Sequence, residues 1–164
     1  MKTDQTAEKM LNQPAARAIC HGVLLARNYF RCTGSNLAGI QPPALEEEWG
    51  RWLFEAPFVL LSHGTEPDPV LNYGNRMALE LWEMHWAQFT AMPSRLTAET
   101  PEREERARLL DSVAMQGYSS NYSGVRFARS GRRFRIVNAS VWNVLDAEGR
   151  PCGQAAFFQK WEWL

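Results

Sequence analysis

Residues 122–146 carry the side chains best suited to bind a charged partner, reading YSGVRFARSGRRFRIVNASVWNVLD with five arginines. A guanidinium group binds carboxylates and phosphates, often through two parallel hydrogen bonds. A basic segment would also suit nucleic acid, but Lys plus Arg and Asp plus Glu each number 18, so the formal net charge is zero. Because nucleic-acid-binding domains are usually basic, we expect no nucleic acid partner.

The Ser-Gly pair at 130–131 predicts a two-residue hairpin turn, which would fix the pairing of the two strands. Counting from this turn places Arg126 opposite Arg135, with Arg133 on the same face. We interpret these three arginines as an outer-face charge cluster. Like charges directly opposite each other destabilise a sheet, so the cluster needs compensation. The alternatives are the glutamates at 46–48 on a preceding helix, an anionic ligand or partner protein, and solvent.

The other face of this hairpin is predicted to be apolar with a few polar groups. Strand alternation places Ser123 and Asn138 on it, and Trp142 closes the same row. An apolar cavity with a few converging polar groups is the usual form of a small-molecule site. We therefore predict a ligand pocket on this inner face. The alternative is that Ser123 and Asn138 satisfy nearby backbone groups.

The irregular stretch PSRLTAE at 93–99 holds a second group of candidate residues. Loops carry function more often than buried elements do. Ser94 and Arg95 could contact a ligand, and Arg95 is suited to clamp a carboxylate or a phosphate. The alternative is that Arg95 pairs with a nearby acid while Thr97 or Thr100 caps the following helix.

The elements that must position these residues follow from the periodicity of the chain. Residues 1–13 are polar and predicted to be disordered. The order of elements predicts an α+β fold: a five-stranded antiparallel sheet with helices on one face, after an N-terminal helical extension at 1–50. The sheet and its helices would form one domain at 51–164. Helices are predicted from Pro14 to the break at GSNLAG, over 42–57, 75–86 and 101–117, and strands over 58–64 and 70–75 with three more within 121–164.

Four segments of the chain resemble the MEKHLA domain, a PAS-like family. They read FVLLSHGTEPDPVLNYGNRMALELWE, MPSRLTAE, YSGVRFARSGRRFRI and VWNVLDAEGRPCGQAAFFQKW, and together they span roughly residues 50–161. The family occurs at the carboxyl end of plant class III homeodomain–leucine zipper proteins and as stand-alone bacterial proteins. No homeodomain or leucine zipper pattern precedes the segments, so the chain resembles the stand-alone bacterial type.

The resemblance implies a sensory or regulatory module that binds a small organic ligand between the sheet and its helices. Polar residues would orient the ligand and tryptophans would wall the pocket. The alternatives are a homodimerisation module without a ligand and a small enzyme that uses the same pocket. The predicted ligand-binding residues are Asn75, Trp82, Ser94, Arg95, Ser123, Asn138, Trp142 and Gln154.

Metal and catalytic motifs are absent from the sequence. The three histidines lack HxxxH or HxH spacing and the three cysteines lack a CxxC pair, so no metal site is predicted. No Ser–His–acid order, Gly-rich phosphate loop or paired catalytic carboxylates stand out, so we favour a protein that is not an enzyme. No apolar run approaches the ~20 residues of a membrane span and no signal core is seen, so we expect a cytoplasmic protein without a membrane partner.

The cofactor stays unassigned at this point. A lone imidazole such as that of His63 or His85 could ligate haem, as it does in some PAS domains. A light-sensing flavin PAS domain would need a reactive cysteine on the helix after NRMALELWE, and the sequence has none there. A photoreactive flavin thiol is therefore rejected, while haem and flavin both remain open as bound groups.

Overall fold

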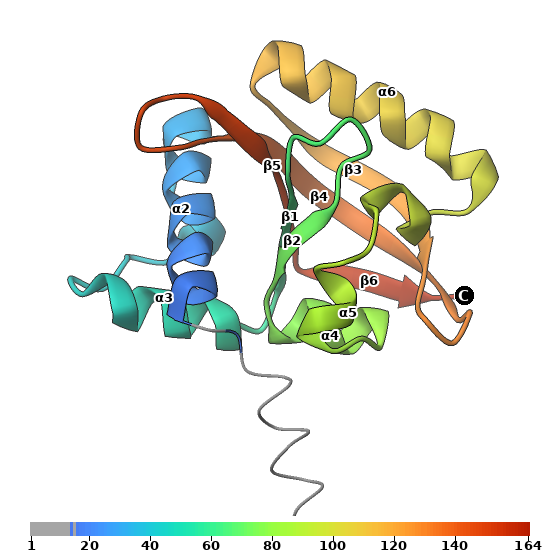
Figure 1. The fold of residues 1–164 in the computed structure, drawn as a ribbon, viewed down its shortest axis with the longest axis horizontal. Coiled ribbons are helices and arrows are strands. Elements are labelled where there is room, and N and C mark those ends of the chain that lie inside the picture. Colours follow the sequence, from blue (N-terminus) through green and yellow to red (C-terminus); the bar gives the residue numbers. More distant parts are fainter. Residues whose placement is uncertain (1–13, 15) are drawn as a thin grey trace, which may run out of the picture.

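The computed structural model describes residue 14 and residues 16–164 of the chain, so the predicted disorder of residues 1–13 lies outside the described residues. The described part contains one antiparallel sheet with a layer of helices on each side (Figure 1). Its strands are β1 (Val59–His63), β2 (Leu71–Gly74), β3 (Tyr118–Phe127), β4 (Arg133–Leu145), β5 (Pro151–Phe158) and β6 (Lys160–Trp163).

The strands lie in the order β2-β1-β5-β4-β3, and β6 pairs with β4. Ser140 pairs with Phe157 and Val137 with Lys160, so β5 and β6 follow one another along the same edge of β4. The helices are α2 (Ala16–Thr33), α3 (Glu46–Glu55), α4 (Arg76–Trp82), α5 (Trp86–Phe89) and α6 (Thr100–Gln116), with short 3-10 turns η1 (Leu37–Gly39) and η2 (Ser94–Thr97). The predicted α+β arrangement is confirmed, with two differences: a sixth strand is present in the described part, and the N-terminal helices cover the second face of the sheet.

The helices cover both faces of the sheet and enclose two separate hydrophobic cores. On one face, α2 and α3 bury residues such as Leu25 and Leu53 against Leu60 and Trp142. On the other face, α4 and α5 bury Leu81 and Phe89 against Val59 and Phe134, and α6 crosses the same side (Figure 1). A strand buried on both faces needs a nearly continuous apolar sequence, which explains the run VLLSH in β1.

The β3–β4 hairpin differs from the predicted two-residue turn by one residue. The amide of Gly131 donates to the carbonyl of Ala128, the amide of Ala128 donates to the carbonyl of Arg132, and Gly131 has a φ of 90°. This is the geometry of a type I turn followed by a glycine bulge. The extra loop residue shifts the register, so Arg126 lies opposite Phe134 rather than Arg135.

A one-residue shift exchanges the two faces of a strand, so the predicted placement of Arg126 is wrong. Arg126 points to the inner face with Phe134, and it is 5% exposed. Arg133 and Arg135 are exposed as expected. Arg133 forms an ion pair with Glu99, and Arg135 lies opposite Glu162 of β6. The outer-face cluster of three arginines therefore does not exist as predicted.

A second irregularity in β4 changes which residues of that strand face the helices α4–α6. Between the pairs Tyr122–Ala139 and Gly124–Ile136, β4 contains one more residue than β3, and Asn138 has a φ of 54°. The amide of Asn138 donates to Ser123 Oγ at 3.3 Å. This bulge reverses the alternation, so Ala139 takes the inner face and Trp142 packs in the core under α2.

Candidate functional site

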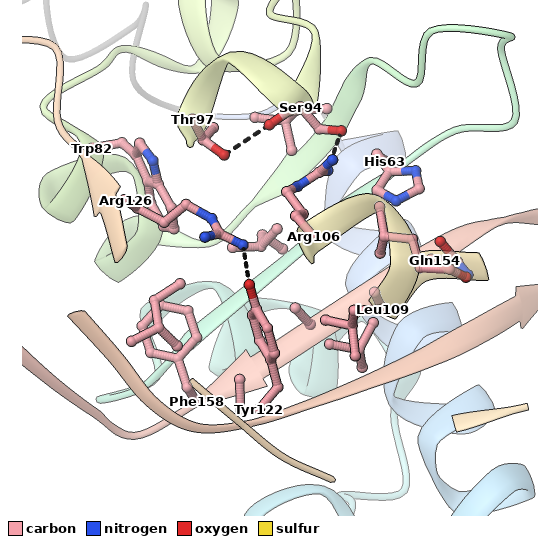
Figure 2. Close-up of a pocket in the computed structure, with 18 of the residues that line it drawn as sticks. His63, Trp82, Ser94, Thr97, Arg106, Leu109, Tyr122, Arg126, Gln154 and Phe158 are labelled. Atoms are coloured by element: carbon pink, nitrogen blue, oxygen red, sulfur yellow. Dashed lines mark hydrogen bonds between the residues drawn. The ribbon is translucent and has the colours of Figure 1, made fainter. Parts of the chain in front are cut away.

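A cavity of about 70 Å³ lies between the inner face of the sheet and the layer formed by α4, α5, η2 and α6 (Figure 2). Most of its wall is apolar. The apolar lining includes Leu61, Leu71, Phe89, Ile136 and Phe158. Two arginines, Arg106 and Arg126, and a small number of other polar side chains complete the wall.

Arg126 enters the cavity from β3. Its Nη1 donates to the carbonyl of Val125 at 2.8 Å, and its Nη2 donates to Tyr122 Oη at 2.9 Å. The guanidinium carbon lies 5.6 Å from the centre of the Tyr122 ring, which holds the side chain in place by a cation–π contact. Because Arg126 is 5% exposed, water compensates little of its charge.

Arg106 enters the cavity from α6 and is held by η2. Its Nη2 donates to Ser94 Oγ at 2.6 Å, and Thr97 Oγ1 donates to the carbonyl of Ser94 at 2.7 Å (Figure 2). Burial, and next to it the positive charge of Arg126, lowers the pKa of Arg106 to about 10. Arg106 is therefore still charged at neutral pH, but holding that charge in the folded protein costs free energy.

The two guanidinium groups have no carboxylate partner among the described residues. The nearby Asp68 forms its ion pair with Arg95, at 3.1 Å, on the surface. The described residues that line the cavity include no Asp, Glu or Cys. In addition, the buried indole Nε1 of Trp82 has no hydrogen-bond partner in the described part of the chain. The polar part of the wall thus presents mainly donors and positive charge, together with the buried Nε2 of His63, which also has no hydrogen-bond partner in the described part of the chain.

An open groove on the protein surface adjoins the cavity. The groove has a volume of about 760 Å³ and runs between α6 and the loop at 64–69. His63, Arg106, Leu110 and Gln154 line both the groove and the cavity. Arg106 therefore stands at the boundary between the buried space and solvent.

Three of the eight predicted ligand residues line the cavity, and so does Arg126. Trp82 and Ser94 do so as predicted, and Arg126 does so against the prediction. Gln154 lies at the boundary, where its Nε2 donates to the carbonyl of Leu110 at 2.9 Å and to Asn143 Oδ1 at 3.2 Å. Gln154 thereby fixes α6 to the sheet.

Asn75 is a structural residue and does not line the cavity. Its side chain is 0% exposed, and Oδ1 accepts from the amides of Leu60 and Ala78 at 3.2 and 3.1 Å. Its Nδ2 donates to the carbonyls of Leu53 and Phe58 at 3.1 and 2.8 Å. With these four hydrogen bonds, Asn75 caps α4 and ties α3 to β1, and its polar groups are already satisfied.

The remaining predicted ligand residues also lie outside the cavity. Arg95 is half-exposed in its pair with Asp68, as the alternative interpretation had it. Ser123 and Asn138 are exposed and hydrogen-bond to each other at the bulge of β4. Trp142 lies on the opposite face of the sheet, where its Nε1 donates to the carbonyl of Leu25 at 3.1 Å. A pocket lies on the helix-covered inner face, but only Trp82, Ser94 and Gln154 of the eight predicted ligand residues line it.

Arg106 and Tyr122 are the residues that the sequence interpretation missed. Arg106 falls in the charge run EREERAR, which reads as a solvated helix face. Its spacing gives the missing signal, because Arg106, Leu110 and Val113 are four and three residues apart and share one side of a helix. Glu46, expected near the arginines of the hairpin, instead pairs with Arg27 of α2 at 3.4 Å.

The cavity does not fit a haem or a flavin. Its volume of about 70 Å³ is well below the roughly 300–1,000 Å³ of pockets for larger organic ligands. None of the three cysteines lines it, and the Nδ1 of His63 donates to the carbonyl of Gly64 at 2.9 Å. The described residues contain no group of three metal-ligating side chains. No helix in the described part is both long and apolar enough to span a bilayer.

Comparison with solved structures shows a PAS-like fold. The PAS domain of a protein from Colwellia psychrerythraea superposes with a TM-score of 0.60 at 10% identity, covering 68% of this chain and 92% of that one. An RNA-binding light-oxygen-voltage receptor gives a TM-score of 0.60 at 19% identity, over 74% of this chain and 36% of that one. The blue-light photoreceptor Vivid gives 0.51 at 14% identity, over 63% and 78%. At these identities the likeness concerns the fold alone.

Comparison with characterised sequences adds the family. Over 143 residues the chain is 25% identical to the homeobox-leucine zipper protein ATHB-14 of Arabidopsis thaliana, covering 85% of this chain and 17% of the plant protein. The chain thus spans about a sixth of that protein's length. The MEKHLA domain family model matches residues 19–163, which include the helices α3–α6 and all six strands. The chain therefore belongs to the MEKHLA domain family and has the PAS-like fold that the sequence motifs implied.

Proposed function

We propose that this MEKHLA domain is a sensory module that binds a small organic ligand in the cavity between the sheet and the layer of α4, α5, η2 and α6. The observation that carries the proposal is the polar wall of the cavity, where Arg106 and Arg126 have no carboxylate partner among the described residues and the buried indole N–H of Trp82 has no hydrogen-bond partner there. Buried polar groups in folded proteins are nearly always satisfied. A ligand with acceptor atoms would complete this wall.

The position of the cavity supports a sensory role. Arg106 belongs to α6, whereas Arg126 and Tyr122 belong to β3, so a ligand bound between them would join the helix to the sheet. A ligand can shift a conformational equilibrium only through different contacts in the two states. Here, contact with both elements would favour the state in which α6 is held against the sheet.

Native mass spectrometry of freshly purified protein, with an absorbance spectrum, tests this proposal. We expect a bound small molecule that Ala139→Leu excludes, because Ala139 lines the cavity and the added volume fills it. Ala91→Leu adds the same volume at an exposed position and serves as the matched control. Identical spectra for both variants and the parent, with no bound mass in any preparation, would count against ligand binding.

We propose a second role, homodimerisation through the N-terminal helices. Phe30 of α2 is 52% exposed, Leu45 before α3 is 67% exposed and Trp52 of α3 is 37% exposed. All three belong to or adjoin the two N-terminal helices, and exposed apolar surface of this kind can serve as an interface. A light-state dimer is known for the fungal photoreceptor Vivid, which shares the fold. Light scattering after size exclusion should give a dimer that Phe30→Ser with Leu45→Ser converts to a monomer, whereas a monomeric parent protein would refute this role.

A further inference from the structure

We infer that the ligand of the cavity is a short aliphatic carboxylate, bound through its oxygens by Arg106 and Arg126 and with its chain against the apolar wall. This inference rests on the proposed function and names the chemical class of the ligand. It follows from the charge, the hydrogen-bond inventory, the size and the access route of the cavity.

The charge of the cavity calls for an anion. Two guanidinium groups face one small space, and no described carboxylate lies within ion-pair distance of either. Buried charges are normally paired, because an unpaired charge in a medium of low dielectric is costly. The lowered pKa of Arg106, caused first by burial and then by Arg126, reflects the same free-energy cost. One negative charge between the two groups would relieve both effects.

The hydrogen-bond inventory also calls for an acceptor. A guanidinium has five N–H donors, of which Arg126 uses two and Arg106 one in the described contacts. Tyr122 Oη and Ser94 Oγ accept from these arginines, so each hydroxyl keeps its own hydrogen for donation. The indole N–H of Trp82 adds another free donor. A carboxylate, which only accepts, matches a wall that mainly donates.

The size and the apolar wall select a short aliphatic chain. A volume of about 70 Å³ holds roughly five to seven water-sized groups at 10–15 Å³ each. Carboxylates of three to five carbons have this number of non-hydrogen atoms. Inorganic phosphate is small enough, but some of its oxygens would lie against Leu71, Phe89 and Ile136, where nothing can hydrogen-bond to them.

The surface groove provides the route of access. Arg106 lines both the groove and the cavity, so its guanidinium lies where an anion would pass from the groove into the cavity. Arg103, which also lines the groove, adds positive charge on the same helix. Glu66, Asp68 and Asp111 also line the groove and offset the charges of its arginines, so the attraction for an anion comes from the arginines of the cavity rather than from the groove as a whole.

Isothermal titration calorimetry with butyrate tests the inference on protein refolded without ligand. We expect butyrate to bind and its neutral isostere butyramide to bind at least 30-fold more weakly, because the amide lacks the charge. Affinity should rise about fourfold for each CH₂ group from acetate to butyrate, the factor given by about 0.8 kcal/mol per buried CH₂. Arg126→Met and Arg106→Met should each abolish measurable binding. Arg133→Met, on the exposed face of the same hairpin, should bind as the parent does.

Each outcome decides the question. Equal binding of butyramide and butyrate would overturn the anionic ligand while leaving the proposed function intact. Tighter binding of inorganic phosphate than of butyrate would overturn the aliphatic class. If neither butyrate nor butyramide binds, the inference fails, and the native mass spectrometry described above separately decides the proposed function. Circular dichroism checks the fold of each variant. If Arg126→Met does not fold, Tyr122→Phe takes its place, because it keeps both charges but removes a donor. We expect Tyr122→Phe to weaken butyrate binding about tenfold.

Discussion

Replacing Arg106 by methionine should stabilise the ligand-free protein even though it removes the ligand. The pKa of Arg106 is lowered from its ordinary value to about 10, chiefly because the side chain is buried and next because Arg126 lies near it. At about 1.36 kcal/mol for each pKa unit, the folded state loses about 3 kcal/mol by keeping this group charged. The whole penalty is present at neutral pH, where Arg106 is protonated in both the folded and the unfolded chain.

Part of the stability gained by removing the charge of Arg106 is offset by the loss of a hydrogen bond. The bond from Arg106 to Ser94 Oγ, at 2.6 Å, contributes about 2 kcal/mol because its donor is charged. Arg106→Met should therefore stabilise the protein by about 1 kcal/mol. The double variant Arg106→Met/Ser94→Ala leaves no hydroxyl without a partner. We therefore expect it to raise the free energy of unfolding by about 2 kcal/mol, which corresponds to a rise in Tm of roughly 4–8 °C.

Urea unfolding at pH 7.5 after ligand-free refolding measures these differences. Arg108→Met is the control, because Arg108 lies on the same helix in an exposed pair with Glu104 and should change the free energy of unfolding by less than about 0.5 kcal/mol. Destabilisation of both the single and the double variant by more than about 1 kcal/mol would refute the reasoning. It would mean that Arg106 stabilises the fold without a ligand.

Three further predictions concern the framework of the site. Asn75→Ala should lower the free energy of unfolding by about 3 kcal/mol in urea titration, because it strips two buried amides and two buried carbonyls of their partner; a loss below about 1 kcal/mol would contradict this role. Gly131→Ala should cost about 1 kcal/mol by the same measurement, since an L-residue is strained at its φ of 90°, and an unchanged midpoint would argue against the bulge. Burial lowers the pKa of His63 below 6.5, so the unfolded state binds more protons and stability should fall as the pH drops below about 6.5; His63→Gln should flatten this slope in denaturation measured from pH 7 to 5.

The fold could be predicted because its elements carry local signals. Pro101 opens α6 and Gly117 follows it, and the apolar run in β1 marks a strand with both faces buried. Only the helix predicted over 75–86 is split, since Glu83 adopts a left-handed φ of 58° between α4 and α5. Motifs that extend over most of the chain made the family visible.

The residues of the site could not be predicted with the same success, because two bulges decide which face each side chain takes. The loop at Gly131 adds one residue and turns Arg126 inward, and the bulge at Asn138 turns Trp142 away from the cavity. Both shifts depend on a single residue in a left-handed conformation, which counting from a turn does not reveal. The sequence predicted a pocket between the sheet and its helices. It assigned the wall residues by strict alternation along the strands, which the two bulges interrupt.

Because of the bulge at Asn138, one face of β4 lines the cavity while its other face packs in the core under α2. Ala139 and Val141 line the cavity, while Trp142 behind them stacks edge-on against Tyr29 of α2, with ring centres 4.9 Å apart. Any displacement of β4 on occupation of the cavity therefore alters the surroundings of an indole on the far side of the sheet. A change in the occupation of the cavity can therefore reach the N-terminal helix α2 directly through β4, because the two lie on opposite faces of the same strand. No separate linker or hinge is needed.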